Sequence, residues 1–236
     1  MYKELFNQMR NGLVVSCQSE EGDLFNQPDL ITLFAKAAIM GGAAGIRSEG
    51  IEVTRMIVEN VNVPVIGLLE PDFEGSTHPV TGKYPEVEAL LGTGCHIIAI
   101  DGTFRIRDKL RGPEFIQEIK KRYNCCVMAD VSTYAEGVAC SDYGADCISS
   151  KLSGHTSDTS FYSKDEPDFN IIQKLIREIS IPVFAEGKIK SPKFARKMIE
   201  YGAWAVIVGS AITRPRVITS WYIEEMKKAL SIEDGS

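Results

Sequence analysis

Four short segments of this sequence begin with glycine and continue through small and apolar residues: Gly42-Ala43-Ala44-Gly45-Ile46, Gly94-Cys95-His96-Ile97-Ile98, Gly144-Ala145-Asp146-Cys147-Ile148 and Gly202-Ala203-Trp204-Ala205-Val206. They recur at intervals of 52, 50 and 58 residues. A glycine that can take a positive φ commonly ends a helix, and the short apolar run after it suits a buried parallel strand. Repetition at this period indicates a closed architecture of similar units.

Other apolar runs lie between the copies, so each interval holds two strand–helix units. With the run before the first copy, the sequence predicts eight strands, at residues 13–17, 44–47, 65–69, 96–101, 126–130, 146–149, 182–186 and 205–209. Continuous apolar runs are typical of strands buried on both faces. We therefore expect a single (β/α)8 TIM barrel over residues 1–236, with a last helix at 217–230 and a disordered tail at 231–236.

Composition excludes several classes of protein. The 236 residues suit one barrel domain of about 250 residues, and 44% apolar residues can fill its core. A net charge of -6 without any Lys/Arg-rich run argues against a nucleic-acid partner. No segment approaches the roughly 18 consecutive apolar residues of a membrane span, so we expect a cytoplasmic protein without a membrane partner. The six cysteines lack paired metal-finger spacing, and we expect reduced thiols and no metal.

Polar or charged side chains follow most of the predicted strands. Barrel enzymes carry their chemistry at this rim, whereas a packed barrel alone needs no such ring. The eight positions are Gln18, Arg47, Glu70, Asp101, Asp130, Lys151, Glu186 and Gly209-Ser210. The sequence therefore predicts an active site among them.

The loops after strands seven and eight resemble an anion site. Barrels frequently bind phosphate there. Gly187 and Gly209 let backbone N–H groups approach an anion, Lys188 and Ser210 follow them, and Arg214 could add a bidentate contact. A tight turn with a helix cap is the alternative for Gly209-Ser210. Because both loops expected to bind phosphate carry suitable residues, we favour a phosphate site.

Asp130 and Glu186 should point into the mouth of the barrel, where either could orient a hydroxyl or move a proton. An internal salt bridge with Arg47 or Lys151 is the alternative for both. Gln18 and Arg47 could hold an amide or a ring oxygen, although Arg47 could instead pair with Glu49 or Glu186. Among the histidines, only His155 is expected near this site. A single histidine in a loop is more often a surface residue than a catalyst. No metal triad is visible.

With these residues assembled, the chain resembles the N-acetylmannosamine-6-phosphate 2-epimerase family of bacterial sialic acid catabolism. The resemblance runs nearly end to end and is carried by these segments: Leu13-Val14-Val15-Ser16-Cys17-Gln18, Ala43-Ala44-Gly45-Ile46-Arg47, Pro64-Val65-Ile66-Gly67, Ile98-Ala99-Ile100-Asp101-Gly102-Thr103, Met128-Ala129-Asp130-Val131-Ser132-Thr133, Leu152-Ser153-Gly154-His155-Thr156, Ala185-Glu186-Gly187 and Val208-Gly209-Ser210-Ala211-Ile212-Thr213-Arg214-Pro215. It implies removal of the C2 proton of a phosphorylated N-acylhexosamine and its return to the opposite face, without any cofactor. By the same resemblance, the sugar and its acetamido group would be surrounded by Gln18, Arg47, Asp130 and Glu186, and the phosphate would be held by Gly187, Lys188, Gly209, Ser210 and Arg214.

One position departs from the family pattern. After strand three the family usually has Lys-Arg-Asp, with the lysine regarded as a catalytic acid/base, whereas this chain has Glu70-Pro71-Asp72. Three accounts are open: Lys151, where the family commonly has a small hydroxyl residue, replaces the lysine; Glu70 is itself the base, with a pKa raised by burial; or the chain binds a related sugar phosphate with different or no chemistry. Lys83 is a weaker candidate, in a predicted surface turn.

We favour an epimerase in which Glu186 and either Lys151 or Glu70 share the proton transfers. The rivals are a barrel isomerase or epimerase for another sugar phosphate, and a protein that binds the sugar phosphate without turnover. Trp221 and Tyr222 on the last predicted helix are compatible with a homodimer or with packing of that helix against the barrel.

Overall fold

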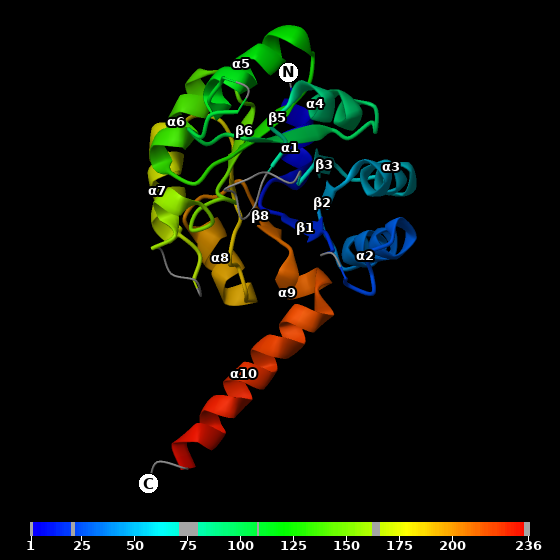
Figure 1. Ribbon diagram of the computed structural model, residues 1–236, viewed down its shortest axis with the longest axis vertical. Helices are drawn as coiled ribbons and strands as arrows, with labels where there is room; N and C mark the ends of the chain where they lie inside the picture. Colours follow the sequence, from blue (N-terminus) through cyan, green and yellow to red (C-terminus); the bar gives the residue numbers. More distant parts are fainter. Residues whose placement is uncertain (1, 20–21, 71–79, 108, 162–165, 234–236) are drawn as a thin grey trace.

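Eight parallel strands close into a barrel in sequence order, β1 beside β2 and so on until β8 pairs with β1 (Figure 1). The computed structural model describes residues 2–19, 22–70, 80–107, 109–161 and 166–233. The strands are β1 (Leu13–Cys17), β2 (Gly45–Glu49), β3 (Val65–Leu68), β4 (Ile97–Asp101), β5 (Val127–Asp130), β6 (Cys147–Ser149), β7 (Val183–Ala185) and β8 (Ala205–Val208). The predicted (β/α)8 barrel is confirmed, and each predicted strand overlaps an observed one with ends that differ by two residues or fewer.

Helices follow the strands and cover the outside of the barrel. They are α2 (Pro28–Met40), α3 (Ile51–Asn60), α4 (Tyr84–Leu91), α5 (Gly112–Arg122), α6 (Tyr134–Asp142), α7 (Phe169–Glu178) and α8 (Pro192–Glu200), with a 3-10 turn η1 (Ser157–Thr159) before α7. After β8 come the short α9 (Ser210–Thr213) and the long α10 (Pro215–Glu233).

Alternation along the strands divides the core into an inner and an outer layer. In β4, Ile97 and Ala99 pack inside the barrel, whereas Ile98 and Ile100 pack outward under the helices. This alternation decides which residue at each strand end faces the mouth.

An additional helix, α1 (Lys3–Met9), lies at the amino-terminal end of the barrel and was not predicted. Its Phe6 and Met9 are buried, and the Phe6 ring lies 6.3 Å from that of Phe184 on β7. Trp204 Nε1 also donates a hydrogen bond of 2.8 Å to the Phe6 carbonyl oxygen. The helix therefore closes the end of the barrel opposite the predicted site.

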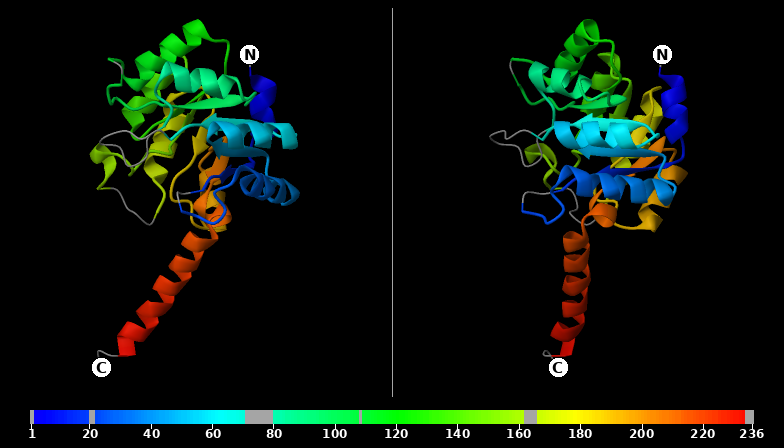
Figure 2. Two further views of the ribbon diagram at one scale, coloured as in Figure 1. Left: turned by 45° about the vertical axis from the view of Figure 1, so that its right-hand side comes forward. Right: turned by 90° about the vertical axis from the view of Figure 1, so that its right-hand side faces the viewer.

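The last helix, α10, projects away from the barrel (Figures 1 and 2). Between Thr219 and Ala229 every residue except Trp221 is exposed. Packing of this helix against its own barrel, one of the two alternatives from the sequence, is therefore wrong for Tyr222, whereas Trp221 does lie against the loop after β7. The helix is longer than the predicted range 217–230, since it runs from Pro215 to Glu233. The predicted disordered tail is therefore wrong for residues 231–233, which are helical, and residues 234–236 lie outside the described part of the chain.

Candidate active site

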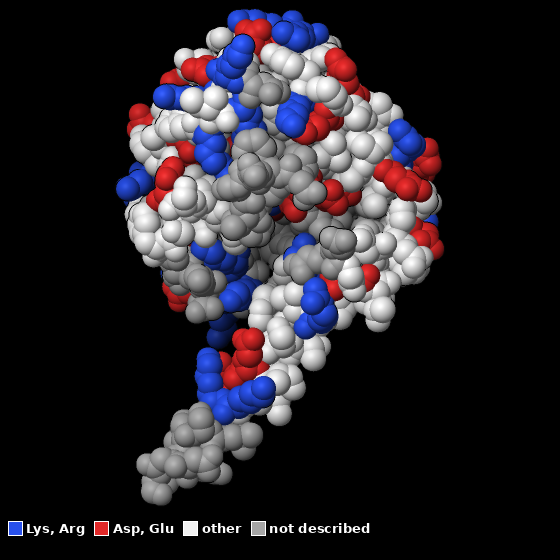
Figure 3. All heavy atoms as spheres, viewed as in Figure 1, with Lys and Arg blue, Asp and Glu red and all other residues white. Residues whose placement is uncertain are grey.

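A cavity of about 670 Å³ opens at the carboxyl ends of the strands, where the face of the molecule is hollowed (Figure 3). Nine of the predicted site residues line it: Gln18, Glu70, Lys151, Glu186, Gly187, Lys188, Gly209, Ser210 and Arg214. Residues that follow five strands, β1, β3, β6, β7 and β8, thus meet at one site. The two other predicted residues, Arg47 and Asp130, are fully buried behind Glu186 rather than on the cavity wall.

Arg47 joins the two carboxylates. Its Nη1 donates to Asp130 Oδ1 at 3.1 Å and its Nη2 to Asp130 Oδ2 at 2.5 Å, and Nη1 also lies 3.0 Å from Glu186 Oε2. Burial opposes the charge on Arg47, but Asp130 and Glu186 outweigh it and raise the pKa of the guanidinium. Of the two partners considered in the alternative interpretation of Arg47, the structure shows the pair with Glu186 and not with Glu49.

Strand alternation explains why these charges face inward. Met128 and Phe184 belong to the inner core, so Asp130 and Glu186, two residues further along, point to the same side. Ile46 packs in the outer layer, and Arg47 therefore points inside.

Glu186 is held by the two serines at the end of β6. Ser149 Oγ donates to Glu186 Oε2 at 2.9 Å, and Ser150 Oγ accepts from the Glu186 N–H at 3.0 Å and donates to its carbonyl oxygen at 2.8 Å. Burial raises the pKa of the Glu186 carboxyl, and the charge of Asp130 adds to this, while Arg47, Lys151 and Ser149 oppose it. The result is an oriented carboxylate that binds a proton more readily than ordinary glutamate.

Glu70 and Lys151 form an ion pair across the mouth. Lys151 Nζ donates to Glu70 Oε1 at 2.6 Å, and the two side chains are 10% and 31% exposed, respectively. Glu49 lies close by: burial and then the charge of Glu70 raise the pKa of its carboxyl, while the Glu70 N–H and Lys151 lower it. The ammonium group of Lys151 therefore lies near two carboxylates, those of Glu70 and Glu49, and on the cavity wall. Most of the loop that follows, residues 71–79, lies outside the described residues.

The opposite end of the cavity is cationic. Gly187 has a φ of 99° and Lys188 a φ of 57°, so the backbone turns sharply directly after Glu186. Burial lowers the pKa of Lys188, Lys190 lowers it further, and Asp168 opposes both. Ser210 begins α9, and Thr213 Oγ1 fixes that helix to the Ser16 carbonyl oxygen at 2.9 Å. Positive charge and exposed backbone thus meet beside an oriented carboxylate.

Residues 31–228 match a family described as "Putative N-acetylmannosamine-6-phosphate epimerase". A curated relative of corresponding description, from Caldanaerobacter subterraneus subsp. tengcongensis, is 40% identical over 232 residues, which are 97% of this chain and 96% of the relative. The chain belongs to this family.

Solved structures agree with this membership. The N-acetylmannosamine-6-phosphate 2-epimerase from Clostridium perfringens superposes with a TM-score of 0.87 at 32% identity, over 93% of this chain and 95% of that one. A thiamine phosphate pyrophosphorylase from Pyrococcus furiosus has a TM-score of 0.60 at 15% identity over 90% of this chain and 91% of that one, which shows the fold alone.

Other strand-end and histidine predictions have mixed outcomes. Asp101 does not line the cavity; it accepts hydrogen bonds from Thr103, Arg105 and Arg107. His155 lines the cavity, whereas His96 lies at the far end of the barrel and its Nδ1 accepts from the Val65 N–H at 3.1 Å. His78 lies outside the described residues.

Sequence reasoning missed Ser149, Ser150 and Lys190. The two serines directly precede Lys151 at a strand end, which could have identified them as hydrogen-bonding partners. Lys190 lies two residues after Lys188 in the same loop, so its charge could have been counted with the anion site.

In the parts of the chain that the structure describes, no group of three or more His, Cys, Asp or Glu side chains is arranged to hold a metal ion. Nor does any helix in those parts have the length and apolar content needed to cross a bilayer.

Proposed function

We propose that this chain interconverts N-acetylmannosamine 6-phosphate and N-acetylglucosamine 6-phosphate by moving the proton on C2. One observation carries the proposal: the cavity brings a buried, oriented carboxylate, Glu186, and an ammonium group, Lys151, together with two loops suited to an anion. Membership of the family and the likeness to the Clostridium perfringens epimerase over nearly the whole chain support the same substrate.

The phosphoryl group binds at the cationic end in this proposal. Backbone N–H groups after Gly187 and Gly209 and the side chains of Lys188 and Arg214 supply hydrogen bonds and charge. Gln18 follows β1, beside β8, and lines the same cavity; its Nε2 is buried and has no hydrogen-bond partner in the part of the chain that the structure describes. This donor suits the acetamido oxygen of the sugar.

The reaction needs two proton-transfer groups and stabilisation of charge on oxygen. In the open-chain sugar, one group removes the C2 proton, the electron pair of the C–H bond moves into the C1–C2 bond, and negative charge develops on O1. A proton returned to the other face of C2 gives the epimer. We assign the two transfers to Glu186 and Lys151, with the order set by the direction of reaction.

Glu70 acts through Lys151 in this account. The resemblance implies a lysine at position 70 and a small hydroxyl residue at 151, whereas here position 151 carries the ammonium group and position 70 a carboxylate that pairs with it. Lys151 is the more buried member and lowers the pKa of Glu186, so it lies within electrostatic reach of the other proton-transfer group. Arg47 and Asp130 position Glu186 from behind.

Incubation with N-acetylmannosamine 6-phosphate, followed by proton NMR, tests the proposal. We expect the C2 epimer to accumulate, and no reaction with pentose phosphates or with unphosphorylated N-acetylmannosamine at the same concentration. Conversion of a different sugar phosphate only would assign the barrel to another isomerase. Tight binding without turnover would make the chain a sugar-phosphate-binding protein.

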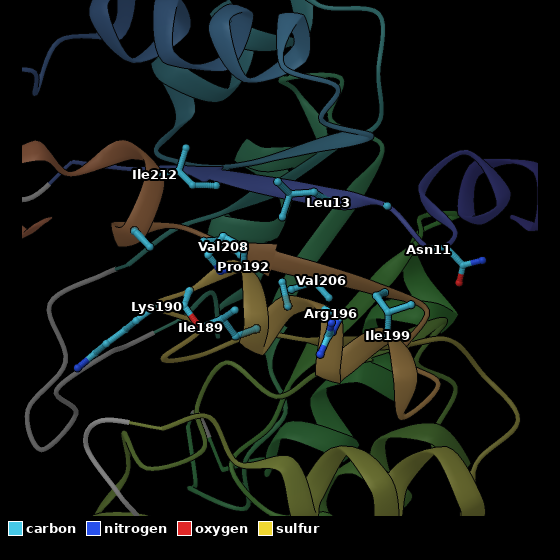
Figure 4. Close-up of a pocket in the computed structure, with 14 residues that line it drawn as sticks. Asn11, Leu13, Ile189, Lys190, Pro192, Arg196, Ile199, Val206, Val208 and Ile212 are labelled. Carbon is cyan, nitrogen blue, oxygen red and sulfur yellow. The ribbon is translucent and has the colours of Figure 1, made fainter.

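We further propose that the protein is a homodimer in which α10 of each copy covers the barrel of the other. The outer layer has a gap between α8 and α2, because α10 projects instead of covering β8 and β1. A hollow of about 350 Å³ occupies this gap (Figure 4). Its apolar wall, named here the α8–β1 groove, consists of Leu13, Ile189, Pro192, Ala195, Ile199, Val206, Val208, Ala211 and Ile212.

A second copy suits the groove better than the chain's own helix. Only Arg214 separates α9 from α10, and Pro215 begins the projecting helix, so little chain is available for α10 to fold back. Ile218, Tyr222 and Met226 recur every four residues on α10, and the latter two are 70% and 65% exposed. In a dimer with twofold symmetry, α10 of each copy would enter the groove of the other, so the exposed face of the helix would be buried and both grooves would be filled.

A further inference from the structure

Lys190 lies in the loop between β7 and α8, beside the anion end of the cavity. Its Nζ lies 5.3 Å from the centre of the Trp221 ring, a distance at which the ring attracts a cation. Both residues line the same cavity as Glu186 and Ser210. Figure 4 shows the Lys190 ammonium directed away from Val206 and Val208 of the groove.

Three cations gather at this end of the cavity: Lys188, Lys190 and Arg214. The charge of Lys190 lowers the pKa of Lys188, so the two ammonium groups are near enough to repel one another. Blue Lys and Arg side chains are seen between the hollow and the base of α10 (Figure 3). An anion with two negative charges would relieve this repulsion.

Trp221 belongs to α10, and it is the residue between Thr219 and Ala229 that is not exposed. An aromatic ring from the projecting helix therefore forms part of the cavity wall. The position of the Trp221 ring therefore restricts where the Lys190 ammonium group can lie.

We propose that Lys190 binds the phosphoryl group of the substrate together with Lys188 and Arg214, and that Trp221 is the positioning residue for Lys190. This inference rests on the proposed sugar-phosphate substrate. Its consequence is that the position of α10 affects anion affinity rather than the proton transfer at the other end of the cavity.

The test measures KM and kcat with N-acetylmannosamine 6-phosphate, and binding of inorganic phosphate by calorimetry. Lys190→Met should raise KM and weaken phosphate binding by about tenfold or more, the effect of losing one charge-assisted hydrogen bond, with kcat little changed. Lys190→Arg should restore most of the affinity. Lys193→Met, which removes the same charge at an exposed position on α8 outside the cavity, is the matched control and should behave like the parent.

Trp221→Ala should weaken phosphate binding by about three- to tenfold, and Trp221→Phe should retain it, because Phe keeps an aromatic face. Equal phosphate affinity in Lys190→Met and the parent, or no phosphate binding by the parent, would overturn the assignment of Lys190. Unchanged affinity in Trp221→Ala would overturn the positioning role. Calorimetry tests the roles of Lys190 and Trp221 without any turnover. If the parent binds phosphate through Lys190 but does not epimerise the sugar, the proposed function is contradicted and the role of Lys190 is not.

Discussion

The ion pair between Glu70 and Lys151 is the residue-scale feature on which our proposal depends most. The resemblance implies a lysine at the position of Glu70, and here the ammonium group of Lys151 comes from across the mouth of the same cavity. In our proposal a catalytic ammonium can be supplied from either position, provided that a carboxylate orients it. The identity of the strand that carries the lysine is then less important than where its Nζ lies.

Exchange of the two charges tests this view. Glu70→Lys alone places two ammonium groups together, and Lys151→Glu alone places two carboxylates together, so each should lower kcat by about 10² or more. The double variant Glu70→Lys/Lys151→Glu should recover most of that loss. Steady-state kinetics of all four proteins measures the coupling, and a double variant as slow as the slower single variant would contradict the exchanged pair.

The pH dependence belongs to Glu186. In the direction of reaction in which Glu186 removes the C2 proton, its carboxylate must be ionised, and burial raises its pKa above the ordinary 4.5. We therefore predict that kcat/KM falls as the pH decreases through a value above 4.5. Ser149→Ala removes a hydrogen bond that lowers this pKa, so its acid limb should move to higher pH, whereas Ser149→Thr should not shift it. An acid limb unchanged in Ser149→Ala would contradict the assignment.

Strand ends could be predicted because each apolar run is buried on both faces and stops where the chain reaches the mouth. The alternation of Met128 with Asp130 and of Phe184 with Glu186 was already present in the sequence. The ion pair of Arg47 with both carboxylates could be named only as one of several alternatives, because side-chain reach depends on which strands become neighbours. Lys190 was missed because its partner Trp221 is 31 residues later in the chain, on a different helix.

At the scale of elements, α1 is the helix that sequence patterns did not indicate. It is short and mostly polar, and its two buried residues, Phe6 and Met9, acquire their role only when the barrel presents an open end. Helix α10 was predicted, but its projection from the barrel was not. In our proposal the groove that receives this helix belongs to a second copy of the protein, which the pattern of a single chain does not reveal.

Truncation of Met9 tests the role of α1. Met9 is fully buried against Gly45, whose position would bring a Cβ within 3.1 Å of the Met9 sulfur. Met9→Ala should lower the free energy of unfolding by about 2–5 kcal/mol because it leaves a cavity. KM should not change, since the site is at the other end of the barrel. Asn7→Ala, on the exposed side of the same helix, is the control and should change stability by less than about 0.5 kcal/mol.

At the scale of the whole molecule, the proposed exchange of α10 completes the outer layer of each barrel. Met226→Asp places a charge on the face that would enter the α8–β1 groove, and Glu224→Gln changes the opposite face. Light scattering should find a dimer for the parent and for Glu224→Gln, and a monomer for Met226→Asp. A parent that is monomeric at micromolar concentration, or a Met226→Asp variant that remains dimeric, would contradict the helix exchange.

The central claim is that Glu186 and Lys151 move the C2 proton at the shared mouth of the barrel. Proton NMR of N-acetylmannosamine 6-phosphate in heavy water follows loss of the C2–H signal directly. We predict rapid loss with the parent, and loss slowed by at least about 10² with Glu186→Gln and with Lys151→Met. Exchange at the parent's rate in Lys151→Met, or no exchange with the parent protein, would contradict it.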